Sequence, residues 1–387
     1  MGQNLEQLPW HDQEILKQAR ELGGFYNAHA HLDRAYTLED RYLRHIGTTP
    51  LEASNLPLSV KQNLVGALHR GEAYTEANLR ERMSYALEMQ ITYGVTRIDT
   101  NIDATPDLPE GGMLAIRVAL ELKEKYKDRI KMNIAPTPIF GFKADPRFKR
   151  TRWEVFEEAA RICDFLSLLA EKDDFDNETD RDGKIGFKAH IRKGIELAFD
   201  LGKKVEIHLD QMNIPGERGT ERFLEIFEGL DQPKVGDGPA VWIIHMISPS
   251  KYPEKQRAKL MNNLLKYNVG VKVCPSAALS MRQMYSLKGA IYNSIARVPE
   301  LIKMKIPVQL GTDNIADVFV PQGDGDMLTE VKMGSVAVRM AAPSIWAKLA
   351  TGTRPNDVDI TTVGGILYQD RKACAKVGPR GWKPAVE

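Results

Sequence analysis

Two histidines near the start of the chain have the spacing of a metal-binding pair. His29 and His31 stand at the end of a short apolar run that begins at Phe25. On an extended strand, residues i and i+2 point to the same face, so both imidazoles can reach one metal ion. The same spacing also arises by chance on polar strand faces, so the pair by itself is a weak indication of a metal site.

Two more histidines and one carboxylate follow strand-like runs in the same way. His208 and His245 each end an apolar run, and Asp313 follows the apolar run that starts at Ile306. In a barrel of parallel strands the catalytic groups lie at the carboxyl ends of the strands, so polar residues at such positions indicate function. Each histidine taken alone could instead cap a strand or be a hydrogen-bonded core residue. Because four of the eight histidines stand at strand ends, a shared site is favoured.

The remaining four histidines lie in charged segments with helical or loop-like patterns. We expect them at the protein surface or in a lid over the site: His11, His45, His69 and His190. The long stretch between His31 and residue 76 could supply such a lid, since loops that follow barrel strands often carry specificity. An ordinary helical insertion with solvated charges is an equally good interpretation of this stretch.

Helix-like and strand-like segments alternate along the rest of the chain. The pattern predicts helices at 76–94, 113–126, 191–202 and 256–268, each followed by a strand, at 95–102, 130–136, 203–208 and 269–274. This order predicts parallel β/α units, either closed into a barrel or wound as an open sheet. A barrel is favoured, because closure brings the first and last strands side by side and so joins their polar ends. The 387 residues suffice, since such a barrel often takes ~250 residues or more.

Composition excludes several classes of partner. The chain has 53 basic and 52 acidic residues, a net charge of +1 and no basic block, so neither nucleic acid nor an anionic membrane is expected as a partner. The first 23 residues have the pattern of an amphipathic helix without a signal-peptide core, and no run of ~20 apolar residues follows. We therefore expect a soluble, cytoplasmic protein.

The three cysteines stand in unrelated contexts, at Cys163, Cys274 and Cys374. An odd number without a repeated spacing predicts reduced thiols rather than a disulfide framework. Cys274 stands at the end of an apolar run and is expected to be a buried strand residue.

Several of these segments together resemble one known family, the amidohydrolase superfamily, and within it the cytosine-deaminase-like branch. The resemblance rests on H-A-H-L-D at 29–33, T-Y-G-V-T-R-I-D-T-N-I-D at 92–103, V-E-I-H-L-D-Q at 205–211, His245, G-T-D-N-I-A-D at 311–317 and G-D-G-D-M-L at 323–328. It covers roughly residues 24 to 370 in order, and the combination is far more specific than any single motif. It implies an α/β fold, a distorted (β/α)8 barrel of the TIM type.

The resemblance also implies a metal site and its chemistry. One divalent ion, zinc or iron, would be held by His29, His31, His208 and Asp313. Such an ion lowers the pKa of a bound water from about 16 toward ~7, which supplies hydroxide at neutral pH. By the same resemblance, His245 would lie beside that hydroxide and Asp313 would also accept its proton. The ligand set leaves one coordination position open for the water, as a catalytic site requires.

A carboxylated lysine at the end of a strand could bridge two metal ions, so the presence of such a lysine decides whether one or two ions are expected. No lysine stands convincingly at the end of the strand-like run 165–173, so a site with a single ion is expected. Lys172 and Lys188 keep the two-metal arrangement open.

Five positions indicate how far the substrate departs from cytosine. The family's H-x-x-E glutamate, which relays a proton to the leaving amine, is Gln211 here, and an amide cannot relay that proton. Ile139 stands where the family has a base-recognising glutamine, and Asn314 replaces the second carboxylate of an Asp-Asp pair. Phe319 stands near the position of a family tryptophan, and Arg34 lies in the stretch that could shape the pocket. We expect these five residues to contact the substrate.

The sequence therefore predicts a mononuclear metal-dependent hydrolase. Metal-bound hydroxide would cleave a C–N bond, by deamination or amide hydrolysis, in a small nitrogen-heterocyclic substrate other than cytosine. Asp313, His245 and Gln211 are the expected catalytic residues. Asp210 is a poor replacement for the missing glutamate, because neighbouring strand residues face opposite ways. The alternative is a catalytically silent protein that keeps the fold and binds a metal or a ligand.

We expect three parts along the chain: a helical extension at 1–23, the hydrolase barrel at 24–370 and a tail at 371–387. The β-sandwich that usually flanks such barrels is largely missing, since the first part is mostly helical and no strand-like run follows the last helix. The N-terminal helix or a second subunit of a homo-oligomer could cover the exposed barrel surface. The acidic segment 171–184 is expected to be a solvated loop.

Overall fold

The computed structural model describes residues 7–175, 183–214, 216–227, 230, 235, 238–280 and 294–377. Within them, eight parallel strands form two sheets. The first sheet has the order β1 (Phe25–Ala30), β2 (Val95–Asp103) and β3 (Lys131–Thr137). The second has the order β4 (Leu166–Leu168), β5 (Val205–Leu209), β6 (Val241–His245), β7 (Gly270–Val273) and β8 (Val308–Leu310). The spatial order of the strands follows the chain order.

Backbone hydrogen bonds join the two sheets at both edges. Between β3 and β4, Asp164 N donates to Ile134 O at 2.8 Å. Beside β1 and β8, Asp313 N donates to His29 O at 2.9 Å, and His31 N donates to Asp313 O at 3.3 Å. The predicted (β/α)8 barrel is thus confirmed as a parallel α/β fold, whereas the described strands form two ladders and not one continuous closed ladder.

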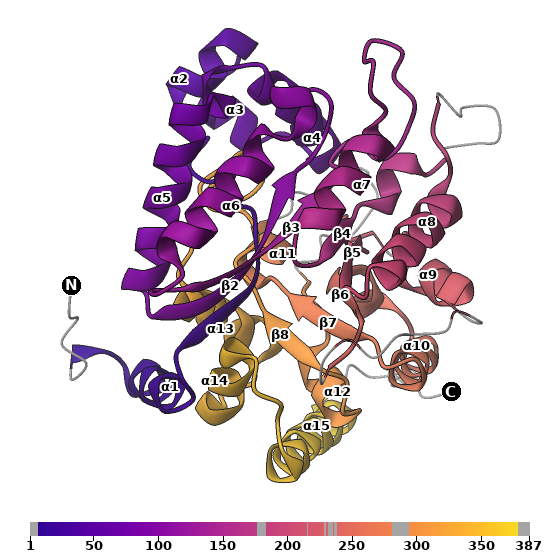
Figure 1. The fold of residues 1–387 in the computed structure, drawn as a ribbon. Coiled ribbons are helices and arrows are strands. Elements are labelled where there is room, and N and C mark those ends of the chain that lie inside the picture. Colours follow the sequence, from indigo (N-terminus) through magenta and orange to yellow (C-terminus); the bar gives the residue numbers. More distant parts are fainter. Residues whose placement is uncertain are drawn as a thin grey trace.

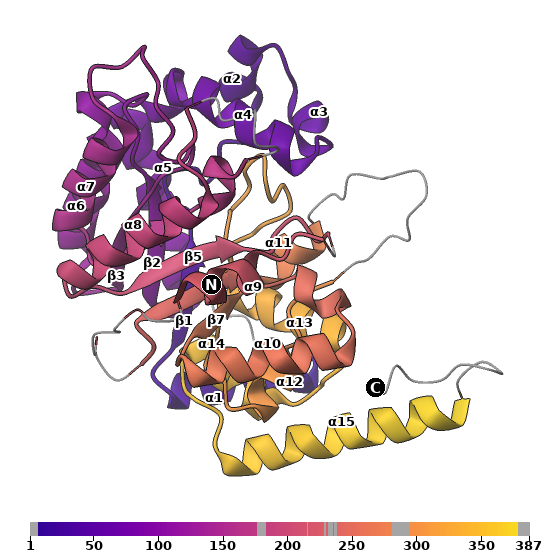
Figure 2. The ribbon, with the colours of Figure 1, turned by 90° about the vertical axis from the view of Figure 1, so that its right-hand side faces the viewer.

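Helices surround the strands, as both ribbon views show (Figure 1, Figure 2). The helices that precede β2 to β8 are α5 (Glu76–Thr92), α6 (Leu114–Tyr126), α7 (Arg152–Ile162), α8 (Phe187–Asp200), α9 (Gly219–Phe227), α10 (Glu254–Lys266), α11 (Pro275–Ser280) and α12 (Val298–Lys303). The four helices predicted from periodicity are α5, α6, α8 and α10, and the strands predicted after them are β2, β3, β5 and β7. These predictions are confirmed.

The pattern of buried residues explains why these helices and strands form. In α8, Phe187, Ile191, Ile195 and Ala198 recur at helical spacing and are all buried, so one face of the helix packs on the core. Every residue of β5 and β6 is buried, which is typical of parallel strands that are covered on both faces.

Three short helices follow β1 and lie together at the top of Figure 1: α2 (Asp40–Leu43), α3 (Pro50–Ser54) and α4 (Leu58–His69). The start of α3 is well specified, because Thr49 and Glu52 form a reciprocal capping box and Pro50 occupies the first helical position. This group corresponds to the stretch that could form a lid.

The two ends of the described chain are helical. Before β1 stands α1 (Trp10–Glu21), which packs on α14 (Pro343–Thr351). After β8 come α13 (Met327–Val338), α14 and α15 (Asp357–Val377), and Figure 2 shows α15 running along the base of the molecule and beyond it. Neither described end contains a strand. The division into extension, barrel and tail stays a prediction.

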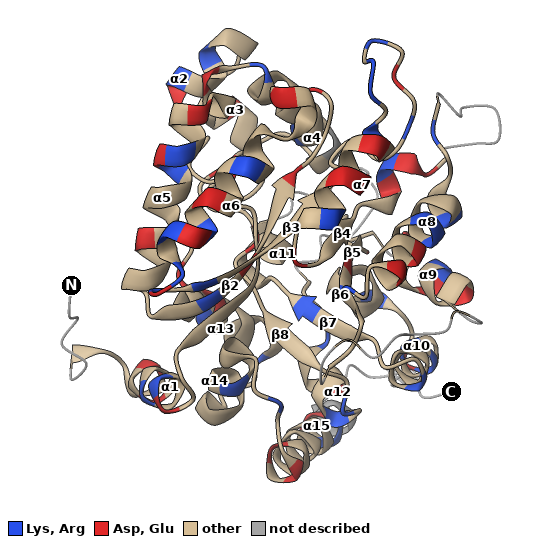
Figure 3. Cartoon of the chain, viewed as in Figure 1, with Lys and Arg blue, Asp and Glu red and all other residues tan. Residues whose placement is uncertain are grey.

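In the view of Figure 3, charged residues of both signs alternate over the outer helices. No helix in the described ranges has both the length and the apolar character that a membrane span requires.

Candidate metal centre

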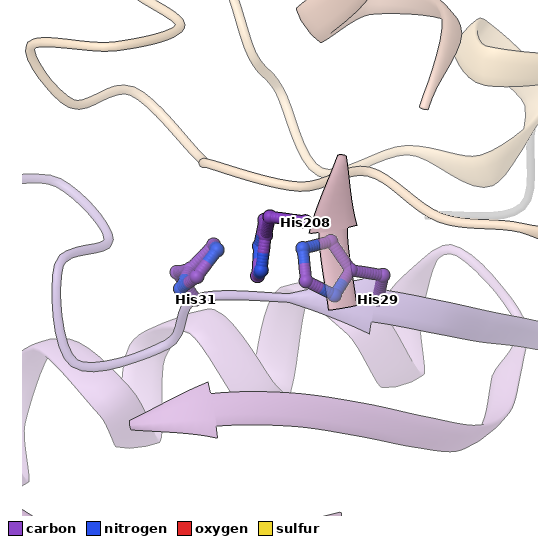
Figure 4. Close-up of side chains that lie close together, drawn as sticks. All are labelled: His29, His31 and His208. Carbon is purple, nitrogen blue, oxygen red and sulfur yellow. The ribbon is translucent and has the colours of Figure 1, made fainter. Parts of the chain in front are cut away.

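Three imidazoles meet at the carboxyl ends of β1 and β5, which are distant in the sequence. His29 lies in β1, His31 just beyond it and His208 in β5, and Figure 4 shows the three rings next to one another. The ring centroids are 4.9 Å apart for His29 and His31 and 5.0 Å apart for His29 and His208. One ring nitrogen of each histidine lies within 4.8 Å of those of the other two. We call these residues the three-histidine cluster.

Asp313 brings a carboxylate to the same place. Its Oδ1 atom lies 3.3 Å from His31 Nε2 and 3.6 Å from His29 Nε2. Its backbone φ of 59° is in the left-handed region, which is uncommon for residues other than glycine and typical of functional sites. Gly311 permits the close approach of this segment to β1, because an added Cβ would lie 2.6 Å from the backbone nitrogen of His29.

Three of the buried imidazoles, those of His31, His208 and His245, have the neutral state that metal binding requires. Burial lowers the pKa of His31 and of His245 to about 4, so both rings are neutral at pH 7. Burial also lowers the pKa of His208 well below its usual value. His29 Nε2 and His31 Nδ1 have no hydrogen-bond partner in the described part of the chain. Neutral imidazoles with free nitrogens next to a carboxylate fit a divalent metal ion.

Glu206 supports the cluster from inside the fold, and the sequence prediction missed it. His29 Nδ1 lies 3.0 Å from Glu206 Oε1, and Lys272 Nζ donates to Glu206 Oε2 at 2.6 Å. Burial alone would lower the pKa of His29, but the carboxylates of Glu206 and Asp313 outweigh it and raise that pKa. A signal was available: Glu206 stands two residues before His208 on one strand, so both point to the same face.

A small cavity of about 30 Å³ adjoins the cluster. It is lined by His31, Arg34, Leu58, Gln62, Thr137, Ile139, Leu169, His208, Gln211, His245, Asp313, Asn314, Phe319 and Val320. Every residue predicted for the site is on this wall except His29, which is fully buried behind it. The structure thus brings the predicted residues together, and their individual roles stay predictions. Leu58 and Gln62 come from α4, so the stretch after β1 does cover the pocket.

Gln211 faces a carboxylate that the sequence prediction missed. Its Nε2 atom donates to Glu171 Oε1 at 2.6 Å, and Gln62 Nε2 donates to the same oxygen at 3.0 Å. Lys172 Nζ in turn donates to Gln62 Oε1, and burial lowers the pKa of Lys172 to about 8. The expectation of a solvated acidic loop was therefore wrong for its first residues, including Asp173, which is fully buried. Residues 176–182 of that segment lie outside the described ranges.

The other predicted substrate residues form the far wall of the cavity. Arg34 is held by Asp103 through two hydrogen bonds of 2.8 and 3.1 Å, and its guanidinium carbon lies 5.5 Å from the centre of the Phe319 ring. Asn314 Nδ2 donates to Asp317 Oδ2. Ile139 is buried and offers only an apolar surface.

Asp210 turns away from the cavity, as expected. Its backbone φ is 58°, and its two carboxylate oxygens accept hydrogen bonds from Gly219 N at 2.7 Å and Thr220 N at 2.9 Å at the start of α9. Neither of the two lysines considered as metal bridges lines the cavity. Lys172 contacts Gln62, and Lys188 lies 3.7 Å from Glu225 at the surface.

Two histidines expected at the surface or in a lid are in fact buried. His69 Nε2 lies 3.0 Å from Asp103 Oδ2, and His190 Nδ1 lies 2.7 Å from Asp173 Oδ2. Both histidines thus have a buried carboxylate partner. The prediction was wrong for His190, whereas His69 ends α4, in the group that could form a lid. His45 is exposed, as predicted.

Known proteins similar to the chain include deaminases. No family model matches it. An uncharacterized protein of Haemophilus influenzae is 28% identical over 291 residues, which are 75% of this chain and 92% of that protein. A pterin deaminase of Rhizobium rhizogenes is 20% identical over 365 residues, which are 90% of this chain and 74% of that protein.

Solved structures share the fold. A 5-methylcytosine deaminase from Klebsiella pneumoniae, liganded with 5-fluorocytosine, matches with a TM-score of 0.67 and 20% identity over 89% of this chain and 82% of that one. An atrazine chlorohydrolase from Arthrobacter aurescens, complexed with zinc, matches with a TM-score of 0.53 and 16% identity over 86% of this chain and 71% of that one. These matches show that the chain shares its fold with the deaminase and with the chlorohydrolase.

Proposed function

We propose that this chain is a metal-dependent hydrolase that cleaves a C–N bond in a small nitrogen heterocycle other than cytosine. The observation that carries this proposal is the convergence of the three-histidine cluster and Asp313 at one wall of the cavity. The fold shared with the 5-methylcytosine deaminase supports the same class of reaction.

A divalent ion, zinc or iron, would be held by His29, His31, His208 and Asp313. When bound, such an ion lowers the pKa of a water so that hydroxide is available at neutral pH. The zinc bound to the atrazine chlorohydrolase supports the choice of zinc.

We infer that the two sheets together act as one distorted barrel around this site. The backbone hydrogen bonds between Asp164 and Ile134 at one edge, and between Asp313 and His29 at the other, support this view. Such closure would hold β1 and β8 together and so fix Asp313 beside the histidines.

Two residues would handle the attacking water. Asp313 would accept its proton, since a carboxylate within hydrogen-bond reach is a suitable general base. His245 Nε2 lies 3.9 Å from Asp313 Oδ2 and would hold the attacking oxygen in place.

Glu171 would supply the proton for the leaving nitrogen. Hydrolysis breaks the C–N bond, adds a hydroxyl group to carbon and requires a proton on nitrogen. Gln211 cannot give up such a proton, but it donates to the Glu171 carboxylate at 2.6 Å. Gln211 would then orient the substrate by hydrogen bonding. Glu171 lies behind Gln62 and Gln211 and would act as the general acid once Gln62 moves outward with α4.

The wall of the cavity supports a substrate other than cytosine. Ile139 offers no hydrogen bond to a base edge, whereas Arg34 and Phe319 present a cation beside an aromatic ring. The cavity has about the volume of one water molecule, so part of its wall must move outward to admit a heterocycle. We infer that α4 opens to admit the substrate.

The test is ammonia or amine release from a panel of compounds by zinc-loaded protein. The panel contains pterin, guanine, cytosine, 5-methylcytosine, N-alkyl triazines and cyclic amides. We expect turnover of at least one compound and none of cytosine at comparable rate, with loss of activity in His208→Ala. His45→Ala, at an exposed histidine, is the matched control and should keep activity. Inertness of metal-loaded protein on the whole panel would instead favour the silent binding protein.

A further inference from the structure

A second group of potential metal ligands lies beside the three-histidine cluster. His245 ends β6, Cys274 directly follows β7 and Asp313 follows β8. One ligand atom of each lies within 4.8 Å of those of the other two. The exposed fractions of the three residues are 2%, 1% and 5%. We propose that His245, Cys274 and Asp313 form a second metal position, with Asp313 shared between this position and the three-histidine cluster.

The carboxylate of Asp313 has the orientation of a bridge. Oδ1 faces the cluster, 3.3 Å from His31 Nε2, whereas Oδ2 faces His245 Nε2 at 3.9 Å. The His245 ring also lies directly beside the cluster, with its centroid 5.5 Å from that of His208. Two-metal hydrolytic sites place their ions about 3.5–4 Å apart, so ligand groups this close suit such a pair.

The backbone and the free nitrogen of His245 favour a ligand over a packing role. The φ angles of His245 and Asp313 are 77° and 59°, so both residues are in a conformation that non-glycine residues rarely adopt. Within the described ranges, the buried Nδ1 atom of His245 has no hydrogen-bond partner. A buried cysteine alone often packs as a small apolar residue. A cysteine beside a carboxylate and an imidazole whose Nδ1 has no partner among the described residues has the composition of a metal site.

The donor types indicate which ion would bind. A thiolate, an imidazole and a carboxylate suit Zn²⁺ or Co²⁺, whereas Mg²⁺ and Ca²⁺ prefer oxygen ligands alone. Three protein ligands leave one position open, as in catalytic rather than structural zinc sites. This second position requires no carboxylated lysine. It goes beyond the proposed function, which places one ion at the cluster and Asp313 and gives His245 a contact to the attacking oxygen. With the second ion bound, His245 would be a ligand of that ion instead.

Cobalt titration tests the proposal without any substrate. Protein stripped of metal with a chelator is titrated with CoCl2, while the bound metal and the absorption spectrum are recorded. We expect two ions per chain and a sulfur-to-cobalt charge-transfer band, because Cys274 would bind as a thiolate. Cys274→Ser should bind one ion and lose the band. Cys163→Ser is the matched control at the other buried free cysteine, and it should keep two ions and the band.

Binding of a single cobalt ion without a thiolate band in the unmodified protein would overturn the proposal, as would a band that persists in Cys274→Ser. The spectrum of the unmodified protein decides the matter even if Cys274→Ser fails to fold. The outcome is also separable from the proposed function. Two bound ions without turnover would refute the hydrolase function and support the second metal position. Turnover with one bound ion would support the hydrolase function and refute the second metal position.

Discussion

The Nδ1 atom of His29 lies 3.0 Å from the Oε1 atom of Glu206, and both side chains are almost completely buried. An ionised carboxylate can only accept, so Nδ1 must carry the hydrogen and Nε2 is left free. Contacts of this kind fix the tautomer and orientation of metal-binding histidines. Glu206 is therefore a positioning residue for the metal centre.

We expect Glu206→Gln to lower zinc affinity by about 10- to 100-fold, because the amide can turn its nitrogen toward His29 and no longer selects one tautomer. The dissociation constant is measured by competition with a chromophoric chelator. Asp173→Asn is the matched control, since Asp173 pairs with the buried His190 at 2.7 Å outside the cluster. That variant should lose stability but keep zinc affinity. Equal zinc affinity in Glu206→Gln and the unmodified protein would contradict the assignment.

Glu171→Gln should lower kcat by about 10²- to 10⁴-fold on any compound that the protein turns over, because general acid–base groups contribute that much. The new amide oxygen can still accept from Gln62 and Gln211, so the pocket should keep its shape and its metal content. The measurement is the pH profile of kcat, which should lose one limb in the variant. If kcat of the variant is lower at every pH but its pH profile keeps the same shape, Glu171 has a structural role.

Exchange of the two partners gives a sharper test of the same pair. Gln211→Glu alone should also reduce activity, because two carboxylates would then face each other across 2.6 Å. The double variant Glu171→Gln/Gln211→Glu has one carboxylate and one amide again, in exchanged places. We expect it to recover part of the activity lost in either single variant. Activity no higher than in the single variants would mean that the position of the carboxylate, and not only its presence, is essential.

The convergence of the candidate metal ligands could be predicted from the sequence, because local spacing controls it. His29 and His31 share a strand face. His208 and Asp313 stand at the ends of short apolar runs, and such runs predict buried strands. The helices α5 and α10 were predictable for the same reason, since their apolar residues recur at helical spacing. The edge contact between Asp164 and Ile134 was not, because pairing between distant strands leaves no local pattern.

The residues that sequence analysis missed act through neighbours that are distant along the chain. Glu171 stands in an acidic segment that resembles a solvated loop, and only the packing of β4 beside β5 brings it to Gln211. Cys274 was expected to be buried, which is confirmed, but its approach to His245 depends on the order of β6 and β7. The burial of His69 could not be predicted, because its carboxylate partner lies 34 residues away, on β2.

Stability should depend on pH through Glu330, a buried residue of α13. Burial raises its pKa from 4.5 to about 8, although its carboxylate accepts a hydrogen bond from Ser276 N at 2.9 Å. Between pH 4.5 and about pH 8, Glu330 is protonated in the folded chain and ionised in the unfolded chain. The free energy of unfolding should therefore fall as pH rises through this window, by about 1.4 kcal/mol per pH unit, and level off above it.

Glu330→Gln keeps an acceptor for Ser276 N and removes the titration. Urea unfolding of both proteins between pH 5 and pH 8 checks the prediction. The free energy of unfolding of the variant, minus that of the unmodified protein, should grow as pH rises. A difference that stays constant with pH would show that Glu330 is not protonated in the folded state.

Gly311 should be the least replaceable glycine at the metal centre. A Cβ at this position would lie 2.6 Å from His29 N and 2.7 Å from His29 O, and backbone atoms cannot move aside as a flexible side chain can. Gly311→Ala must therefore push the segment after β8 away from β1 and strain the hydrogen bond from Asp313 N to His29 O. We expect a loss of about 1–3 kcal/mol in the free energy of unfolding, together with weaker zinc binding.

Gly365→Ala is the matched control, because nothing lies within 4 Å of its added Cβ and it stands in the helix α15. That substitution should raise the free energy of unfolding by about 0.5–1 kcal/mol and leave zinc binding unchanged. A Gly311→Ala protein as stable as Gly365→Ala, with full zinc affinity, would mean that β1 and the segment carrying Asp313 are not held as closely as the structure has them.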